Sequence, residues 1–150
     1  MSFTKSVYHI VFGTKYRQPT IPIDVERKLY KILYDLMKNY GAFVYRIGGM
    51  PDHVHILVQL PATIAVADFV RDLKTATNVY LKDNKGSFPN FDGWAKSYCA
   101  LSYSIREKDM VVNYIRNQKE HHKRVSFKDE LLDLLRESGV EVDMKYFMVD

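Results

Sequence analysis

A short run at residues 51–60, PDHVHILVQL, places two histidines among apolar and β-branched residues, a composition that predicts a buried strand. Side chains two apart on a strand project from the same face, so His53 and His55 aim at one point while Val54 and Ile56 pack the other side. Neutral imidazole is a common metal ligand, and the pair therefore indicates a divalent metal site. Two histidines that only hydrogen-bond within the core are the alternative.

The rest of the chain predicts the element order βαββαβ from alternating and three- to four-residue apolar spacings. We expect strands at residues 6–15, 42–48, 53–60 and 97–105, and helices at residues 22–41 and 63–82. Two amphipathic helices on one face of a four-stranded antiparallel sheet form the ferredoxin-like arrangement of the α+β class. Function is expected on the open face, although unrelated proteins share this fold and it assigns no reaction.

The length of 150 residues and the hydrophobic content of 47% fit a single domain, which we expect to span residues 1–150. The single cysteine, Cys99, excludes an internal disulfide, and residues 1–5 lack the apolar run of a secretion signal. No apolar stretch approaches the roughly 20 residues that span a bilayer. We therefore expect a cytoplasmic protein with no membrane partner.

Charge is distributed unevenly along the chain. Residues 129–150 carry seven acidic and two basic residues, a charge of −5, so that residues 1–128 carry +9. The basic residues are densest at 114–128, which indicates a polyanionic partner, with an ordinary solvated helix face as the alternative. Leucines at helical spacing predict that the acidic segment at about 126–150 packs as a final helix and tail of the same domain.

A further helix is expected at about residues 107–122, and it carries Tyr114 and Gln118. Four residues apart, the phenol and the amide lie on one helix face. The alternative is a tyrosine packed on the sheet with a solvent-facing glutamine. A free tyrosine has a pKa near 10, so it attacks well only if a metal, a nearby cation or a base favours the phenolate. His121 and His122 point about 100° apart on a helix, and we interpret them as phosphate contacts or surface residues, not ligands.

Several of these motifs resemble, in the same order, those of one family, the single-tyrosine HUH transposases of small bacterial insertion sequences. This IS200-like family includes REP-associated relatives. The resemblance rests on HVH at residues 53–55, YIRNQ at residues 114–118 and YHIVFGTKYR at residues 8–17, and it extends along nearly the whole chain.

The resemblance implies that His53, His55 and Gln118 bind Mg²⁺ or Mn²⁺ and that Tyr114 is the catalytic nucleophile. It implies a DNA transposase that cleaves and rejoins single-stranded DNA at insertion-sequence ends through a 5′-phosphotyrosine with a free 3′ hydroxyl. Recognition of terminal DNA hairpins is implied as well. So is a homodimer with shared active sites, in which Tyr114 acts in cis or in trans.

Candidate DNA contacts are six basic residues, Lys15, Arg17, Lys74, Lys119, Lys123 and Arg124. Phe88, Phe91 and Trp94 are candidates for base stacking, with a core position as the alternative for Trp94. Two other functions fit the sequence: a non-catalytic nucleic-acid-binding module on a ferredoxin-like sheet, and a metal-dependent phosphoesterase that uses water. Zinc is disfavoured as the metal. Structural zinc sites usually have four Cys or His ligands, and the single Cys99 is not part of such a pattern. A domesticated relative acting on chromosomal repeats also fits the sequence.

Overall fold

Four strands of the computed structural model, which describes residues 2–145 and 147–148, form one antiparallel sheet in the order β2-β3-β1-β4. The strands are β1 (Ser6–Gly13), β2 (Phe43–Met50), β3 (His53–Leu60) and β4 (Cys99–Tyr103), and the helices between them are α1 (Glu26–Asn39) and α2 (Val66–Asp83). The strand order and the βαββαβ sequence confirm the ferredoxin-like prediction.

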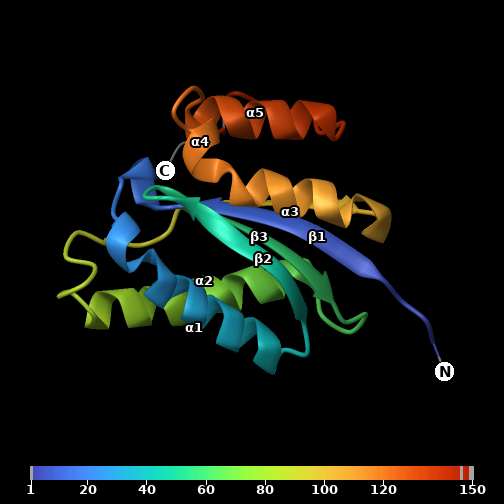
Figure 1. Cartoon of the computed structure of the whole chain (residues 1–150), viewed down its shortest axis with the longest axis horizontal. Helices are drawn as coiled ribbons and strands as arrows, with labels where there is room; N and C mark the ends of the chain where they lie inside the picture. Colours follow the sequence, from blue (N-terminus) through green and yellow to red (C-terminus); the bar gives the residue numbers. More distant parts are fainter. Residues whose placement is uncertain (1, 146, 149–150) are drawn as a thin grey trace.

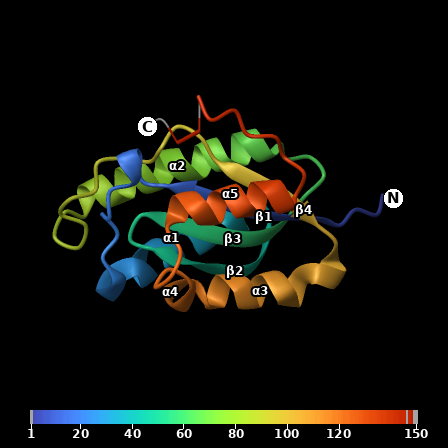
Figure 2. The ribbon, with the colours of Figure 1, turned by 90° about the horizontal axis from the view of Figure 1, so that it is seen from above.

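Helices cover both faces of this sheet, as Figure 1 shows: α1 and α2 lie beneath it, and the later helices lie above it. These later helices are α3 (Lys108–Arg116), α4 (Gln118–His121) and α5 (Phe127–Glu137), and short 3-10 turns occupy Lys15–Arg17, Ile23–Val25 and Ile105–Glu107. Seen from above, α5 runs over β1 and β3 while α3 runs along the β2 side (Figure 2). The acidic segment thus forms the predicted final helix, and it closes over the face that we expected to be open.

The main core lies between the sheet and the first two helices. Val54, Ile56 and Val58 of β3 are all fully buried on this side, as their alternation with the histidines predicts. They pack with apolar residues spaced three and four apart on α1 and α2, namely Leu29, Leu33, Met37, Phe69, Val70 and Leu73. This packing fixes which face of β3 the histidines occupy.

Two smaller apolar clusters hold the upper helices. α3 buries Val111 and Ile115 against Val7 and Leu57. α5 is fixed over β1 and β4 by a cluster of Val11, Cys99, Leu101, Phe127 and Leu134. Between these two clusters the sheet presents its polar side chains, so the functional site lies between α3 and α5.

The structure differs from the expected boundaries in two places near this site. β2 continues to Met50, which pairs with His53, so the connection between β2 and β3 is only the two residues at 51–52. The expected continuous helix breaks at Asn117, whose φ of −93° and ψ of 15° separate α3 from α4. The break lies between Tyr114 and the residues of α4, which begin at Gln118.

The aromatic residues of the loop after α2 belong to the core. Phe88 and Phe91 are 0% and 3% exposed, so the prediction that they stack on bases is wrong. Trp94 donates its indole N–H to Thr77 Oγ1 at 2.9 Å and packs edge-on against Phe12, which confirms the core alternative. Composition identified a loop rich in turn formers, but only the tertiary structure shows that the loop folds back over the core.

Gly48 allows α3 to approach the sheet closely. A Cβ atom at this position would lie 2.8 Å from Ile115 Cγ2 and 3.0 Å from the Ile115 carbonyl oxygen. We expect Gly48→Ala to lower the free energy of unfolding by about 1–3 kcal/mol, because the helix must shift, as denaturant titration will measure. Gly86→Ala is the control, since a Cβ there meets nothing within 4 Å. Equal unfolding free energies for the two variants would contradict this account.

Candidate metal and nucleophile site

The two histidines of β3 are both fully buried on the upper face of the sheet. The Nδ1 atom of each histidine has a partner. His53 Nδ1 lies 2.7 Å from Asp52 Oδ1, and His55 Nδ1 lies 2.7 Å from Nε2 of His9 on β1. Partners of this kind fix the orientation of an imidazole and leave the other nitrogen for a ligand. The Nε2 atoms of both histidines therefore face one common point, as the strand spacing predicts.

Glu130 of α5 reaches this common point, a contact that sequence reasoning missed. Its Oε1 atom lies 3.3 Å from His53 Nε2, 3.2 Å from His55 Nε2 and 2.9 Å from His122 Nε2. Glu130 is 2% exposed, and His122 comes from the turn after α4. The structure thus corrects our interpretation of His122, which lies in the site and not on the surface.

Tyr114 and Gln118 meet the same carboxylate on its other side. The Tyr114 hydroxyl donates to Glu130 Oε2, and the Gln118 amide Nε2 donates to the same oxygen at 2.7 Å. Gln118 Oε1 lies 3.1 Å from His53 Nε2, and the Tyr114 and His55 ring centroids are 5.8 Å apart. The structure therefore brings all four sequence-predicted site residues together within one chain.

Burial and the shared carboxylate set the charges in this site. Burial lowers the pKa of His55 to about 4, because it outweighs the hydrogen bond to Glu130. Burial also opposes ionisation of Glu130, but hydrogen bonds from His122, His53 and His55 hold the pKa of this carboxyl well below its usual range. The result is an ionised carboxylate next to an imidazole that stays neutral at pH 7.

Burial and the hydrogen bond to Glu130 raise the pKa of Tyr114 well above its ordinary value. The side chain is therefore a phenol at neutral pH. Of the three groups that the sequence analysis names as able to favour the phenolate, a metal, a nearby cation or a base, the one in contact with the hydroxyl is a carboxylate, which can act as a base. Glu130 Oε2 accepts the hydroxyl hydrogen.

The donors in this pocket suit a divalent ion. The donor atoms of His53, His55, His122 and Glu130 all lie within 4.8 Å of one another. Two ligand atoms each about 2.1 Å from one ion are about 3.0 Å apart when they sit at right angles, which is close to the Glu130 distances above. Imidazole and carboxylate together suit manganese and other transition metals, whereas magnesium prefers oxygen. The residues therefore fit a metal ion.

The six predicted DNA contacts are scattered and partly engaged in other interactions. Lys119 pairs with Glu26 at 2.9 Å and also donates to the Gly49 carbonyl, while Lys123 pairs with the exposed Glu120 at 2.9 Å. Lys74 donates to backbone carbonyls of the loop before β4, which indicates a structural role. Lys15 lines the same surface pocket as Lys74, and Arg124 is exposed.

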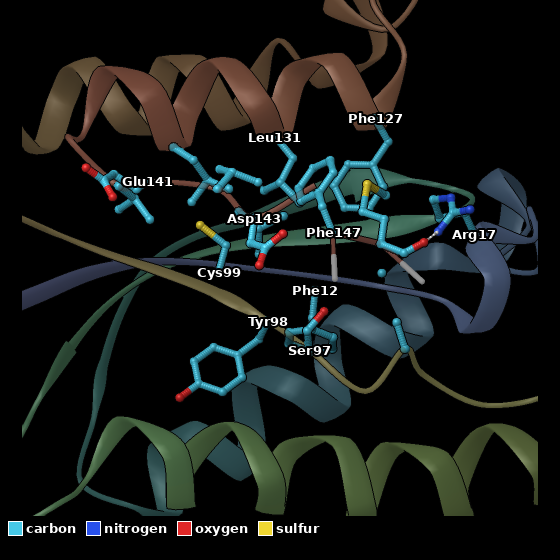
Figure 3. A pocket seen from close by; sticks show the side chains of 17 residues that line it. Phe12, Arg17, Ser97, Tyr98, Cys99, Phe127, Leu131, Glu141, Asp143 and Phe147 are labelled. Carbon is cyan, nitrogen blue, oxygen red and sulfur yellow. Dashed lines mark hydrogen bonds between the residues drawn. The ribbon is translucent and has the colours of Figure 1, made fainter. Parts of the chain in front are cut away.

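Arg17 lies beside a separate cavity of about 320 Å³ between α5 and strands β1 and β4. Figure 3 shows Phe127 and Leu131 of α5 pointing down into this cavity and Arg17 at the end near Phe127. The Arg17 guanidinium donates to the Met148 carbonyl at 2.6 Å. The Phe127 ring also stacks on the His53 ring, with 3.9 Å between centroids and 2° between planes. The cavity therefore adjoins the metal site, with Phe127 between them.

Comparison with known proteins identifies the family. The model of the family described as "Transposase IS200 like" matches residues 2–118, which is most of the chain. The chain belongs to this family. The ISDra2 transposase TnpA of Deinococcus radiodurans is 32% identical over 117 residues, covering 75% of this chain and 84% of the relative. The transposase for insertion sequence element IS200 of Salmonella typhimurium is 26% identical over 120 residues, covering 77% and 78%.

Solved structures resemble the chain too. A crystal structure of a Deinococcus radiodurans protein assigned as a transposase superposes with a TM-score of 0.60 at 30% identity, covering 78% of this chain and 93% of that one. A REP-associated tyrosine transposase bound to a REP hairpin superposes with a TM-score of 0.59 at 13% identity, covering 83% and 73%. The family match ends at Gln118, so the IS200-like transposase fold supplies the sheet, Tyr114 and Gln118, whereas His122 and Glu130 lie beyond the matched residues.

The sequence around Glu130 carries one signal of a site residue. It is an acidic residue among the apolar residues of α5, three positions after Phe127 and four before Leu134. A charged residue on the buried stripe of a helix needs a partner, which marks it as a candidate site residue.

Among the described residues, none of the helices has the length and apolar character that a membrane span requires.

Proposed function

We propose that this chain is a DNA transposase that cleaves and rejoins single-stranded DNA at the ends of an insertion sequence. Tyr114 is the nucleophile, and His53, His55 and Gln118 hold Mg²⁺ or Mn²⁺. The observation that carries the proposal is that Tyr114 packs near the His55 ring and shares the Glu130 carboxylate with both imidazoles of β3, in a chain of the IS200-like family. On this basis the whole of residues 1–150 acts as one domain.

Each side chain of the site has its own role in the proposed reaction. A divalent ion bound at the histidines supplies positive charge that neutralises the non-bridging phosphate oxygens. Asp52 and His9 hold the two imidazoles in place through their Nδ1 atoms. Phe127 covers His53 and keeps water away from it. Gln118 holds the carboxylate that positions the Tyr114 hydroxyl.

The covalent step is a transesterification. The Tyr114 hydroxyl oxygen attacks phosphorus, a P–O bond to the tyrosine forms, and the P–O3′ bond breaks. The phenolic proton ends on the departing 3′ oxygen, giving a free 3′ hydroxyl and a 5′-phosphotyrosine. The phosphotyrosine link is itself a phosphodiester and keeps the reactivity of the bond that was cleaved. A second DNA hydroxyl can therefore displace the tyrosine and rejoin the strands without ATP.

The DNA partner is proposed as single-stranded at the scissile phosphate, with a hairpin nearby. The Tyr114 hydroxyl contacts the buried Glu130 carboxylate beneath α5, a place that a single strand reaches more easily than a duplex, and a relative of the same fold is bound to a REP hairpin. Lys15, Lys123 and Arg124 remain candidates for backbone contacts. We propose a cytoplasmic location as well, because the DNA that the reaction requires lies in that compartment.

A homodimer is also proposed. β4 lies at one edge of the sheet, where a second copy of the strand can pair and remove the exposed edge. Within one chain α3 folds back over its own sheet, so Tyr114 and His55 already meet without a partner. This arrangement favours an active site contained in one subunit over a shared one.

The test is a covalent capture assay with labelled single-stranded DNA from the ends of the element that encodes the chain, with Mg²⁺ or Mn²⁺. We expect a labelled protein band on denaturing gels and a shorter DNA fragment that ends in a 3′ hydroxyl. Cleavage without a labelled band would instead support the water-using phosphoesterase. Binding without cleavage in either metal would support the non-catalytic binding module. Chelation by EDTA is the control and should abolish the band.

A further inference from the structure

The carboxylate of Glu130 sits at the centre of the site, and its contacts extend beyond the Tyr114 hydroxyl that it positions. Its Oε1 atom faces three imidazole nitrogens at 2.9 to 3.3 Å, and its Oε2 atom accepts from Tyr114 and Gln118. None of these partners carries a fixed charge. A carboxylate that is 2% exposed needs a countercharge to offset its lost hydration, and a divalent ion supplies one.

We propose that Glu130 and His122 are themselves ligands of the divalent ion, in addition to His53 and His55. This inference rests on the proposed metal-dependent function and deepens it. The three distances from Glu130 Oε1 to the imidazole nitrogens, 2.9 to 3.3 Å, are those of neighbouring ligands around one ion, and all four donor atoms lie within 4.8 Å of one another. With the Gln118 amide oxygen included, an octahedral ion keeps one position for a phosphate oxygen.

The assignment makes α5 part of the metal site. His53 and His55 come from β3, His122 follows α4, and Glu130 comes from α5, so the ion ties the C-terminal helix to the sheet. Phe127 stacking on His53 and the Ser126 cap, whose Oγ accepts from Asp129 N at 3.2 Å, hold α5 in position for this contact. The carboxylate also makes the site anionic, which favours a divalent ion more than neutral donors alone do.

Two measurements on the full-length metal-free chain test the assignment. In the first, Mn²⁺ is titrated calorimetrically into wild type, Glu130→Gln and His122→Asn. We expect each variant to lose at least about tenfold in affinity, because even residues that only support a ligand contribute this much. Asp133→Asn, which changes an exposed acid on the same helix, is the matched control and should keep wild-type affinity.

In the second measurement, amide hydrogen exchange of the wild-type chain is followed with and without Mn²⁺, which needs no variant. An ion bound by Glu130 slows exchange in α5, because it tethers this helix to the sheet. Faster or unchanged exchange in α5 would overturn the assignment, since the ion would then displace Glu130 or ignore it. Unchanged or tighter Mn²⁺ binding by Glu130→Gln would overturn it as well.

The outcomes also separate this inference from the proposed function. If wild type binds Mn²⁺ and forms the DNA adduct but Glu130→Gln binds equally well, only the role of Glu130 fails. If Mn²⁺ binding depends on Glu130 and His122 but no adduct forms with any end sequence, the metal site stands and the transposase proposal fails. If wild type binds neither Mn²⁺ nor Mg²⁺, both fail together.

Discussion

Tyr114→Phe is expected to abolish the covalent protein–DNA band and to lower the rate of DNA cleavage by at least about a thousandfold. The variant keeps the ring that packs near His9 and His55 but lacks the oxygen that would bond to phosphorus. Its cost in folding stability is that of one hydrogen bond to the ionised Glu130 carboxylate, about 1.5–3 kcal/mol. Single-turnover cleavage and denaturing gels provide the measurement.

The control for this variant is Tyr45→Phe. Tyr45 also contacts the apolar cluster beneath α3, and its hydroxyl donates to Gln59 Oε1 at 3.0 Å. The same chemical change there removes a hydrogen bond outside the metal site, so cleavage should remain at the wild-type rate. If Tyr114→Phe still cleaves DNA and only the band is lost, water is the nucleophile and the phosphoesterase alternative is correct.

His53→Ala is expected to weaken Mn²⁺ binding by at least about a hundredfold and to abolish adduct formation. His53 Nε2 faces both Glu130 Oε1 and Gln118 Oε1, so its removal takes a nitrogen from the centre of the donor set. Asp52→Asn provides a graded comparison. It leaves every proposed ligand in place but weakens the contact to His53 Nδ1, so we expect a loss between about tenfold and a hundredfold. Calorimetric titration measures both.

A loss of affinity in Asp52→Asn equal to that in His53→Ala would contradict the separate roles assigned to these residues. Wild-type binding by His53→Ala would contradict the proposed metal site altogether.

His53→Ala also tests whether two subunits share an active site. An equimolar mixture of His53→Ala and Tyr114→Phe chains should stay inactive if each active site lies within one chain. Recovery of the adduct in the mixture would show that Tyr114 serves the histidines of a partner subunit.

Local patterns predicted the sheet and its two covering helices well. Alternation along β3 separated Val54 and Ile56 from His53 and His55, and three- to four-residue spacing identified α1 and α2. These patterns succeed because the period of a strand or helix decides which side chains share a face. Phe88 and Phe91 were misassigned because burial of a loop depends on where the loop returns to the core, which composition does not specify.

The sequence by itself determined that His53 and His55 face one point, that Tyr114 follows the last strand on a helix, and that the chain folds as a ferredoxin-like sheet. These are short-range consequences of backbone geometry or of motifs that lie close together in the chain. Only the tertiary structure decided that His122 and Glu130 join them. The packing of α5 over β1 and β4 is a long-range effect, so no local spacing places a carboxylate 75 residues from His55 within 3.2 Å of it.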